Sequence, residues 1–129
     1  MDGNTPLSQI KTVQQLLMVL VAEGWQKSPW DHPSVFPGCS SDRLPCWELS
    51  DGLTNIRTGV STIYLHPGLG EDDGNLFASA DHRDGQILEW CLQEYYSDDF
   101  IILEPESLCI NELKDRLVIW GSTWAREAS

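Results

Sequence analysis

The stretch that decides the fold reads DHRDGQILEWCLQEYYSDDFIILEPESLCINELKDRLVIWGSTW (residues 81–124). Its apolar periodicities predict, in order, an amphipathic helix, a short strand, a proline turn and a second helical segment. Local signals agree throughout this stretch, which is typical of a scaffold. We therefore expect any working surface to lie outside it.

The first predicted element of this stretch is a helix that begins near residue 84. Asp81 or Asp84 is a suitable N-cap, and Asp98-Asp99 ends the pattern. The apolar residues that share one helical face are Ile87, Leu88, Cys91, Leu92 and Tyr95.

The second part of the stretch predicts a buried strand and a closing helix. Phe100 to Leu103 reads as a short buried strand, and Pro105 turns the chain. An apolar seam with spacings of three and four then predicts a helix; its members are Ile110, Leu113, Leu117, Trp120 and Trp124. A competing interpretation makes Arg116 to Trp120 a strand, because its centre is a contiguous apolar run.

Upstream, the sequence predicts a helix over residues 13 to 23. Thr12 and Gln15 match a capping box, and Gly24 is placed to end the helix. Leu16 through Ala22 is apolar around the whole circumference, so the helix either lies in the core or faces a partner.

Two strands are predicted in the middle of the chain. β-branched and aromatic residues dominate Thr58 to His66, and Asn75 to Ala80 is the returning strand after an acidic turn at 67 to 74. Together with the helices they predict an α+β fold: a small, mainly antiparallel sheet packed against two or three helices.

At 129 residues, the chain fits a single domain, 1–129. Residues 1–8 have little apolar content and are expected to form a loose N-terminal arm. Residues 25–51 are rich in proline and aromatic side chains and read as a long loop. A connection of that length is either a functional loop or a missed element.

Charge limits the classes of partner. The formal net charge of −12 disfavours direct contact with nucleic acid or anionic lipid and favours a protein with a basic surface. Solubility alone is the competing explanation. The apolar run Leu16 to Ala22 is far shorter than the ~20 residues needed to cross a bilayer. We therefore expect no membrane contact and a cytoplasmic protein.

The candidate chemical motifs predict no catalytic residue, no metal site and no cofactor. His32, Cys39 and Cys46 lack a standard zinc spacing. His82 and Cys91 are expected at different places on a helix, which argues against a nucleophile and base pair. We expect the cysteines to be free thiols.

The second half resembles a known family. Gln86-Ile-Leu-Glu-Trp-Cys-Leu, followed by Phe100-Ile-Ile-Leu-Glu-Pro-Glu-Ser-Leu, is similar to the C-terminal extension of bacterial WYL-domain transcriptional regulators over about residues 58–121. The resemblance implies a ferredoxin-like βαβ packing with a role in oligomerisation and effector control. Residues 1 to 57 show no basic recognition helix, so the family's DNA-binding role and its functional residues are not carried over.

These observations favour a non-enzymatic acidic interaction protein of bacterial or phage type, such as an immunity protein or a phage- or plasmid-encoded inhibitor of a basic, nucleic-acid-handling protein. The expected partner-binding residues are Trp30 and Trp47 as anchors, with Glu71, Asp72, Asp73, Asp98 and Asp99 raising the association rate. One alternative is an oligomerising or ligand-sensing module like the WYL extension, for which a homodimer is possible. The third is a metal protein or enzyme that uses the 25–51 loop.

Overall fold

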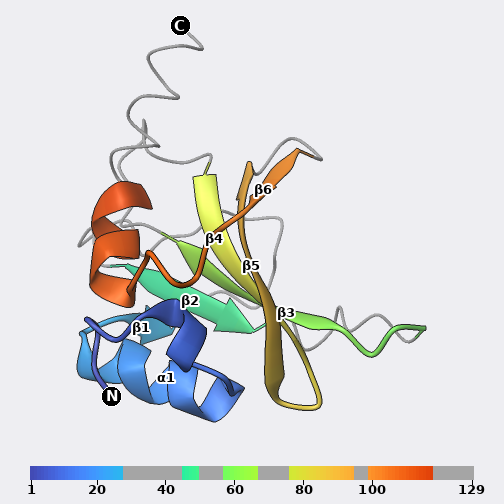
Figure 1. Cartoon of the computed structure of the whole chain (residues 1–129), viewed down its shortest axis with the longest axis horizontal. Coiled ribbons are helices and arrows are strands. Elements are labelled where there is room, and N and C mark those ends of the chain that lie inside the picture. The colour runs from blue at the N-terminus through green and yellow to red at the C-terminus, as the bar shows by residue number, and fades with distance from the viewer. Residues whose placement is uncertain (28–44, 50–56, 67–75, 95–98, 118–129) are drawn as a thin grey trace, which may run out of the picture.

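The computed structural model describes residues 1–27, 45–49, 57–66, 76–94 and 99–117 (Figure 1). Its elements are η1 (Leu7–Gln9), α1 (Val13–Ala22), β1 (Gln26–Lys27), β2 (Cys46–Leu49), β3 (Ser61–His66), β4 (Leu76–Arg83), β5 (Gln86–Glu94) and β6 (Phe100–Ile102), followed by a helix over residues 110–117. The six strands form one sheet in sequence order, β1-β2-β3-β4-β5-β6. Among these described strands, β1 and β2 run parallel to each other and all the other neighbouring pairs are antiparallel. This architecture confirms the predicted α+β fold.

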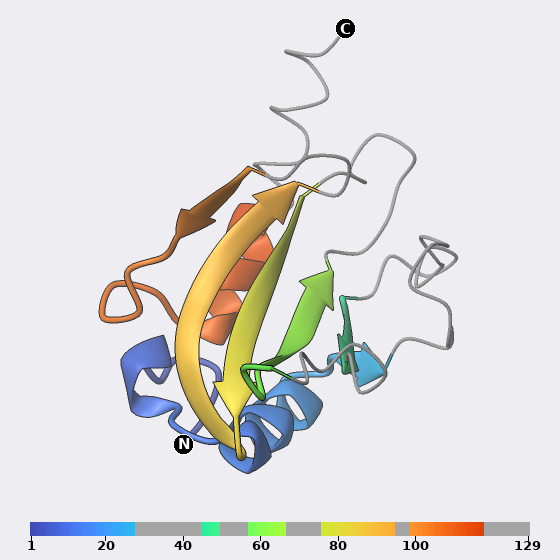
Figure 2. The same ribbon diagram turned by 90° about the vertical axis from the view of Figure 1, so that its right-hand side faces the viewer.

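The core lies between one face of the sheet and the helices. Figure 2 shows the strongly curved β4 and β5 with the 110–117 helix behind them and α1 below. The sheet contributes alternate side chains, among them Ile63, Leu65, Ala78, Ala80, Trp90 and Leu92, and the helices contribute Leu16, Leu20, Ile110, Leu113 and Leu117. Residues from both ends of the chain therefore share one hydrophobic cluster.

Helix α1 begins at the predicted capping box. The amide of Gln15 donates to Oγ1 of Thr12 at 3.1 Å, and Oε1 of Gln15 accepts from the amide of Thr12 at 3.3 Å. Gly24, at φ +85°, follows the helix end in a conformation that favours glycine. Within the described residues, no helix combines the length and the apolar character needed to cross a membrane.

The predicted helix after residue 84 is wrong, because Gln86–Glu94 is strand β5. Asp84 and Gly85 form the turn of a hairpin with β4, with φ values of 52° and 77°. Positive φ at both central residues is the signature of a type I′ hairpin turn, for which Asp-Gly is a preferred sequence. Asp84 is thus a turn residue and not a helix cap.

A β-bulge explains why β5 has a helical apolar pattern. Asp81 pairs with Glu89, but the next residue, His82, pairs with Ile87, which leaves Leu88 as an extra residue on β5. Ile87 and Trp90, three positions apart, therefore both pack against the core. The strict alternation of a regular strand is lost at this point.

The other predictions for the second half are partly confirmed. Phe100–Ile102 is a strand, β6, but its side chains are exposed and not buried. Arg116 and Leu117 belong to the helix, as the apolar seam predicted, and residues 118–124 lie outside the described part of the chain.

The segment read as a long loop contains two strands. Gln26–Lys27 and Cys46–Leu49 pair with each other, and the latter also pairs with β3. The prediction missed them because β1 is short and because β2 follows a proline-rich stretch. Residues 28–44 lie outside the described part.

Residues 1–8 are docked, in contrast to the expected loose arm. The amide of Leu7 donates to the carbonyl of Leu108 at 2.8 Å, and the amide of Asn111 donates to the carbonyl of Gly3 at 3.0 Å. The Leu7 side chain is fully buried. The N-terminus therefore contributes to the core.

The expectation of free thiols holds for Cys91 and Cys109 and is wrong for Cys46, which is disulfide-bonded. The remaining cysteine, Cys39, lies outside the described residues.

A substitution at Gly85 tests the hairpin turn, because the change in the free energy of unfolding should have the opposite sign in a turn and in a helix. Gly85→Ala should lower the free energy of unfolding by about 1 kcal/mol or more, because alanine disfavours positive φ. In the interior of a helix the same change would be stabilising by up to ~1 kcal/mol. Urea unfolding monitored by circular dichroism measures the difference. Asp84→Asn is the control, since asparagine also tolerates positive φ, and a stabilised Gly85→Ala protein would contradict the hairpin.

Candidate functional site

The face of the sheet opposite the helices carries a group of polar and aromatic side chains, which we call the polar face. Strand alternation places on it Thr62, Tyr64 and His66 from β3, Phe77, Ser79 and Asp81 from β4, and Glu89, Cys91 and Gln93 from β5. Ser79 and Cys91 are only 0% and 3% exposed, and the carboxylates of Asp81 and Glu89 are partly exposed. The most polar part of this face is thus half-buried.

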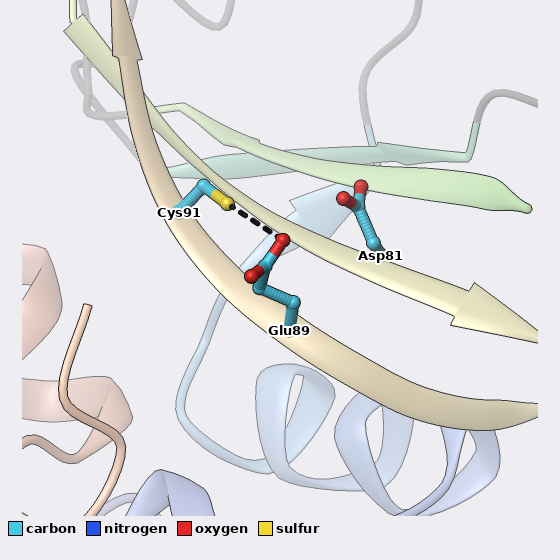
Figure 3. Close-up of side chains that lie close together, drawn as sticks. All are labelled: Asp81, Glu89 and Cys91. Atoms are coloured by element: carbon cyan, nitrogen blue, oxygen red, sulfur yellow. Dashed lines mark hydrogen bonds between the residues drawn. The ribbon is translucent and has the colours of Figure 1, made fainter. Parts of the chain in front are cut away.

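Two carboxylates meet a thiol at the centre of the polar face. Asp81 on β4 lies directly opposite Glu89 on β5, and Cys91 is the next residue on the same side of β5. Figure 3 shows the three side chains converging, with Sγ of Cys91 donating to Oε2 of Glu89 at 3.8 Å. One ligand atom from each residue lies within 4.8 Å of the other two.

Neighbouring side chains orient this cluster. The hydroxyl of Thr62 donates to Oδ1 of Asp81 at 2.8 Å, and Nε2 of Gln93 donates to the hydroxyl of Ser79 at the same distance. Like charges directly opposite on a sheet face disfavour folding by roughly 0.2–1 kcal/mol. The donors from Thr62 and Cys91 offset part of that repulsion, so hydrogen bonds within the chain account for the geometry.

The environment suppresses ionisation of the thiol. Burial, followed by the charges of Glu89 and Asp81, raises the pKa of the Cys91 thiol to about 11. A cysteine nucleophile requires the opposite shift, since the thiolate is the reactive form. Cys91 is therefore a neutral hydrogen-bond donor near neutral pH.

Aromatic rings extend the polar face toward β2. The rings of Tyr64 and Phe77 meet edge to face with centroids 5.3 Å apart, and the ring of His66 lies 5.9 Å from that of Phe77. Nε2 of His66 is 3.8 Å from Oε2 of Glu48. Burial, followed by the charges of Asp81 and Glu48, raises the pKa of Tyr64, so its phenol stays protonated above its ordinary range.

The cluster offers the donor types of a cation site, in contrast to the sequence prediction of no metal ligands. A thiolate with two carboxylates suits Zn²⁺ better than Ca²⁺ or Mg²⁺, which prefer oxygen donors alone. Binding would displace the thiol proton. Within the described part of the chain, these three residues form the one group of three or more potential ligands that lie close enough together to share an ion.

A second feature is the apolar edge of the sheet. Phe100, Ile101 and Ile102 are 59%, 64% and 57% exposed, and they form β6, the last strand in the sheet order. Exposed acidic residues flank them, with Asp99 before the strand and Glu104 after it. Figure 2 shows β6 at one end of the sheet. The large apolar side chains exposed on α1, by comparison, are only Met18 and Val21.

The predicted partner-binding residues have different outcomes. Trp47 is 8% exposed, pairs with Leu65 and belongs to the core, so its expected role as an exposed anchor is wrong. Asp99 is exposed beside β6, as that role requires. The remaining candidates, Trp30, Glu71, Asp72, Asp73 and Asp98, lie outside the described residues.

Comparison with known proteins identifies no relative of this chain. The chain matches no protein-family model, no curated protein and no solved structure.

The raised pKa of Cys91 predicts an unusual pH dependence of its alkylation. After brief exposure to iodoacetamide, modification of Cys91 should reach its midpoint only near pH 11, because burial and the two carboxylates oppose thiolate formation. Peptide mapping by mass spectrometry separates Cys91 from Cys109. Glu89→Gln should lower the midpoint, since it removes the largest charge effect, whereas Glu104→Gln should leave it unchanged. A wild-type midpoint near the ordinary value of ~8.5 would contradict the predicted environment.

Proposed function

We propose that this chain is a non-enzymatic acidic interaction protein that binds a basic, nucleic-acid-handling protein, in the manner of an immunity protein or a phage- or plasmid-encoded inhibitor. The observation that supports this proposal best is the exposed apolar strand β6 between acidic flanks. An apolar centre surrounded by charge is the usual anatomy of a protein-binding patch.

The charge of the chain defines the class of partner. A net charge of −12 repels nucleic acid and attracts proteins whose own ligand is a polyanion. Electrostatic attraction of this kind raises the association rate, while desolvated apolar contacts slow dissociation. Phe100 replaces Trp47 in this proposal as the aromatic anchor, because it is exposed and Trp47 is not.

The polar face supports a binding protein more than an enzyme. The pKa of the Cys91 thiol is raised, which disfavours nucleophilic catalysis by this residue. The hydroxyl of Ser79 is fully buried and accepts a hydrogen bond from Gln93. These contacts describe a sheet face held together by hydrogen bonds.

An oligomerising regulatory module is the alternative proposal. The exposed edge of β6 is also a possible homodimer contact, as the WYL resemblance implies. The segment that resembles the family's helix is, however, strand β5 in this structure. Light scattering separates the two proposals, because the alternative requires a stable dimer.

The disulfide at Cys46 bears on the proposed location. Disulfides persist mainly in oxidising compartments and are rare in the cytosol. The disulfide therefore argues against the predicted cytoplasmic location, which stays a prediction. An inhibitor that binds its target in an oxidising compartment is consistent with both the acidic net charge and the disulfide at Cys46.

Affinity capture tests the proposed function. The immobilised chain is exposed to a nuclease-treated lysate of its host, and retained proteins are identified by mass spectrometry. We expect basic nucleic-acid-binding proteins that are released by raised salt, and we expect the purified chain to inhibit their binding to nucleic acid.

The matched control is a triple variant, Phe100→Thr, Ile101→Thr and Ile102→Thr, which keeps the net charge and the β-propensity of the strand. It should retain much less of the same proteins. Equal retention by both chains, or retention of proteins that are not basic, would reject the proposal. Circular dichroism confirms that the variant is folded.

A further inference from the structure

We infer that the outer edge of β6, which pairs with no further strand in the described part of the chain, accepts an extended segment of the basic partner as an additional strand of the sheet. This inference rests on the proposed function and specifies how the partner is held. The described sheet ends at β6, so an added strand would continue the order β1 to β6 beyond its last member.

The hydrogen-bond ladder shows which backbone groups face outward. The amide of Leu103 donates to the carbonyl of Trp90 at 2.8 Å, and Ile101 lies opposite Leu92 in the same register. Because antiparallel ladders alternate, the backbone groups of Leu103 and Ile101 are directed to β5, while those of Phe100 and Ile102 are directed to the outer edge. Two amides and two carbonyls are thus positioned to pair with an incoming strand.

The side chains of β6 would be covered by that strand on both faces of the sheet. Phe100 and Ile102 lie on the polar face, opposite Gln93 and Cys91, and Ile101 lies on the helix face. All three are more than half exposed. An added strand with β-branched residues opposite them would bury apolar area on each face, which a partner resting on one face alone would not.

Charge selects a basic segment over a second copy of this chain. Asp99 precedes β6 and Glu104 and Glu106 follow it, and all three are exposed. A second β6 would place acidic flanks beside acidic flanks in either orientation, between chains that each carry −12. A segment with an apolar centre and basic ends is complementary along its whole length.

A synthetic peptide tests the inference with the full chain. The probe has a Val-Thr-Val-Thr-Val centre and two lysines at each end, and its fluorescence anisotropy is measured on titration with the protein. A second peptide carries glutamates in place of the lysines, and a third is N-methylated at alternate central residues. We expect binding of the first peptide, no measurable binding of the second, and at least about tenfold weaker binding of the third.

Variants of one residue separate backbone pairing from side-chain contact. Ile102→Pro removes an outward amide and leaves the ladder bond of Leu103 in place, so it should weaken binding of the first peptide by about tenfold or more. Ile102→Thr keeps the amide and should weaken binding less. If Ile102→Pro does not fold, the N-methylated peptide supplies the same information with the wild-type chain.

The outcomes distinguish the two proposals. If the lysine peptide binds equally well to Ile102→Pro and after N-methylation, strand addition is excluded and the acidic binding protein remains. If the glutamate peptide binds as well as the lysine peptide, the basic partner itself is excluded. A stable homodimer in sedimentation experiments that Ile102→Pro dissociates would overturn the inference by assigning the edge to a second copy.

Discussion

The hairpin between β4 and β5 determines which side chains meet in the rest of the structure. Its turn is fixed to the start of α1, because the amide of Val13 donates to the carbonyl of Gly85 at 2.9 Å and the amide of Ile87 donates to the carbonyl of Lys11 at the same distance. The bulge at Leu88 then sets the alternation along β5. A shift by one residue would exchange the faces of Trp90 and Glu89 and place a carboxylate in the core. The core and the polar face therefore depend on the same register.

The sequence predicts those elements whose signals lie within a few residues of one another. The capping box of α1 involves Thr12 and Gln15 alone, and both contacts form as expected. For β5 the local signals mislead, because the bulge brings Ile87 and Trp90 to one face at a spacing typical of a helix. The Asp-Gly pair at 84–85 carried the information that a turn precedes this segment. Propensity for turns was therefore the more reliable guide here than apolar periodicity.

The candidate sites were harder to predict because they depend on pairing between strands. Asp81 and Glu89 meet only through the register of β4 with β5, which no local pattern contains. Hydrophobicity also fails to distinguish an edge strand from a central one, so β6 read as buried although it is exposed. Trp47 shows the reverse error, since a tryptophan near prolines suggested an exposed anchor while its strand places it opposite Leu65. In each case, position within the sheet overrides residue type.

An exposed apolar edge requires an explanation in any stable protein, because it can pair with other copies of the chain. Natural edge strands are usually protected by a lysine, a proline, a bulge or a covering element. β6 contains neither lysine nor proline, but charged residues also protect edge strands, and the exposed acidic residues Asp99 and Glu104 flank it. This kind of protection is selective, since repulsion acts against chains of the same charge and becomes attraction toward a basic segment. Under the proposed function, the same charge would therefore disfavour pairing between two copies and favour a partner of opposite charge at this edge.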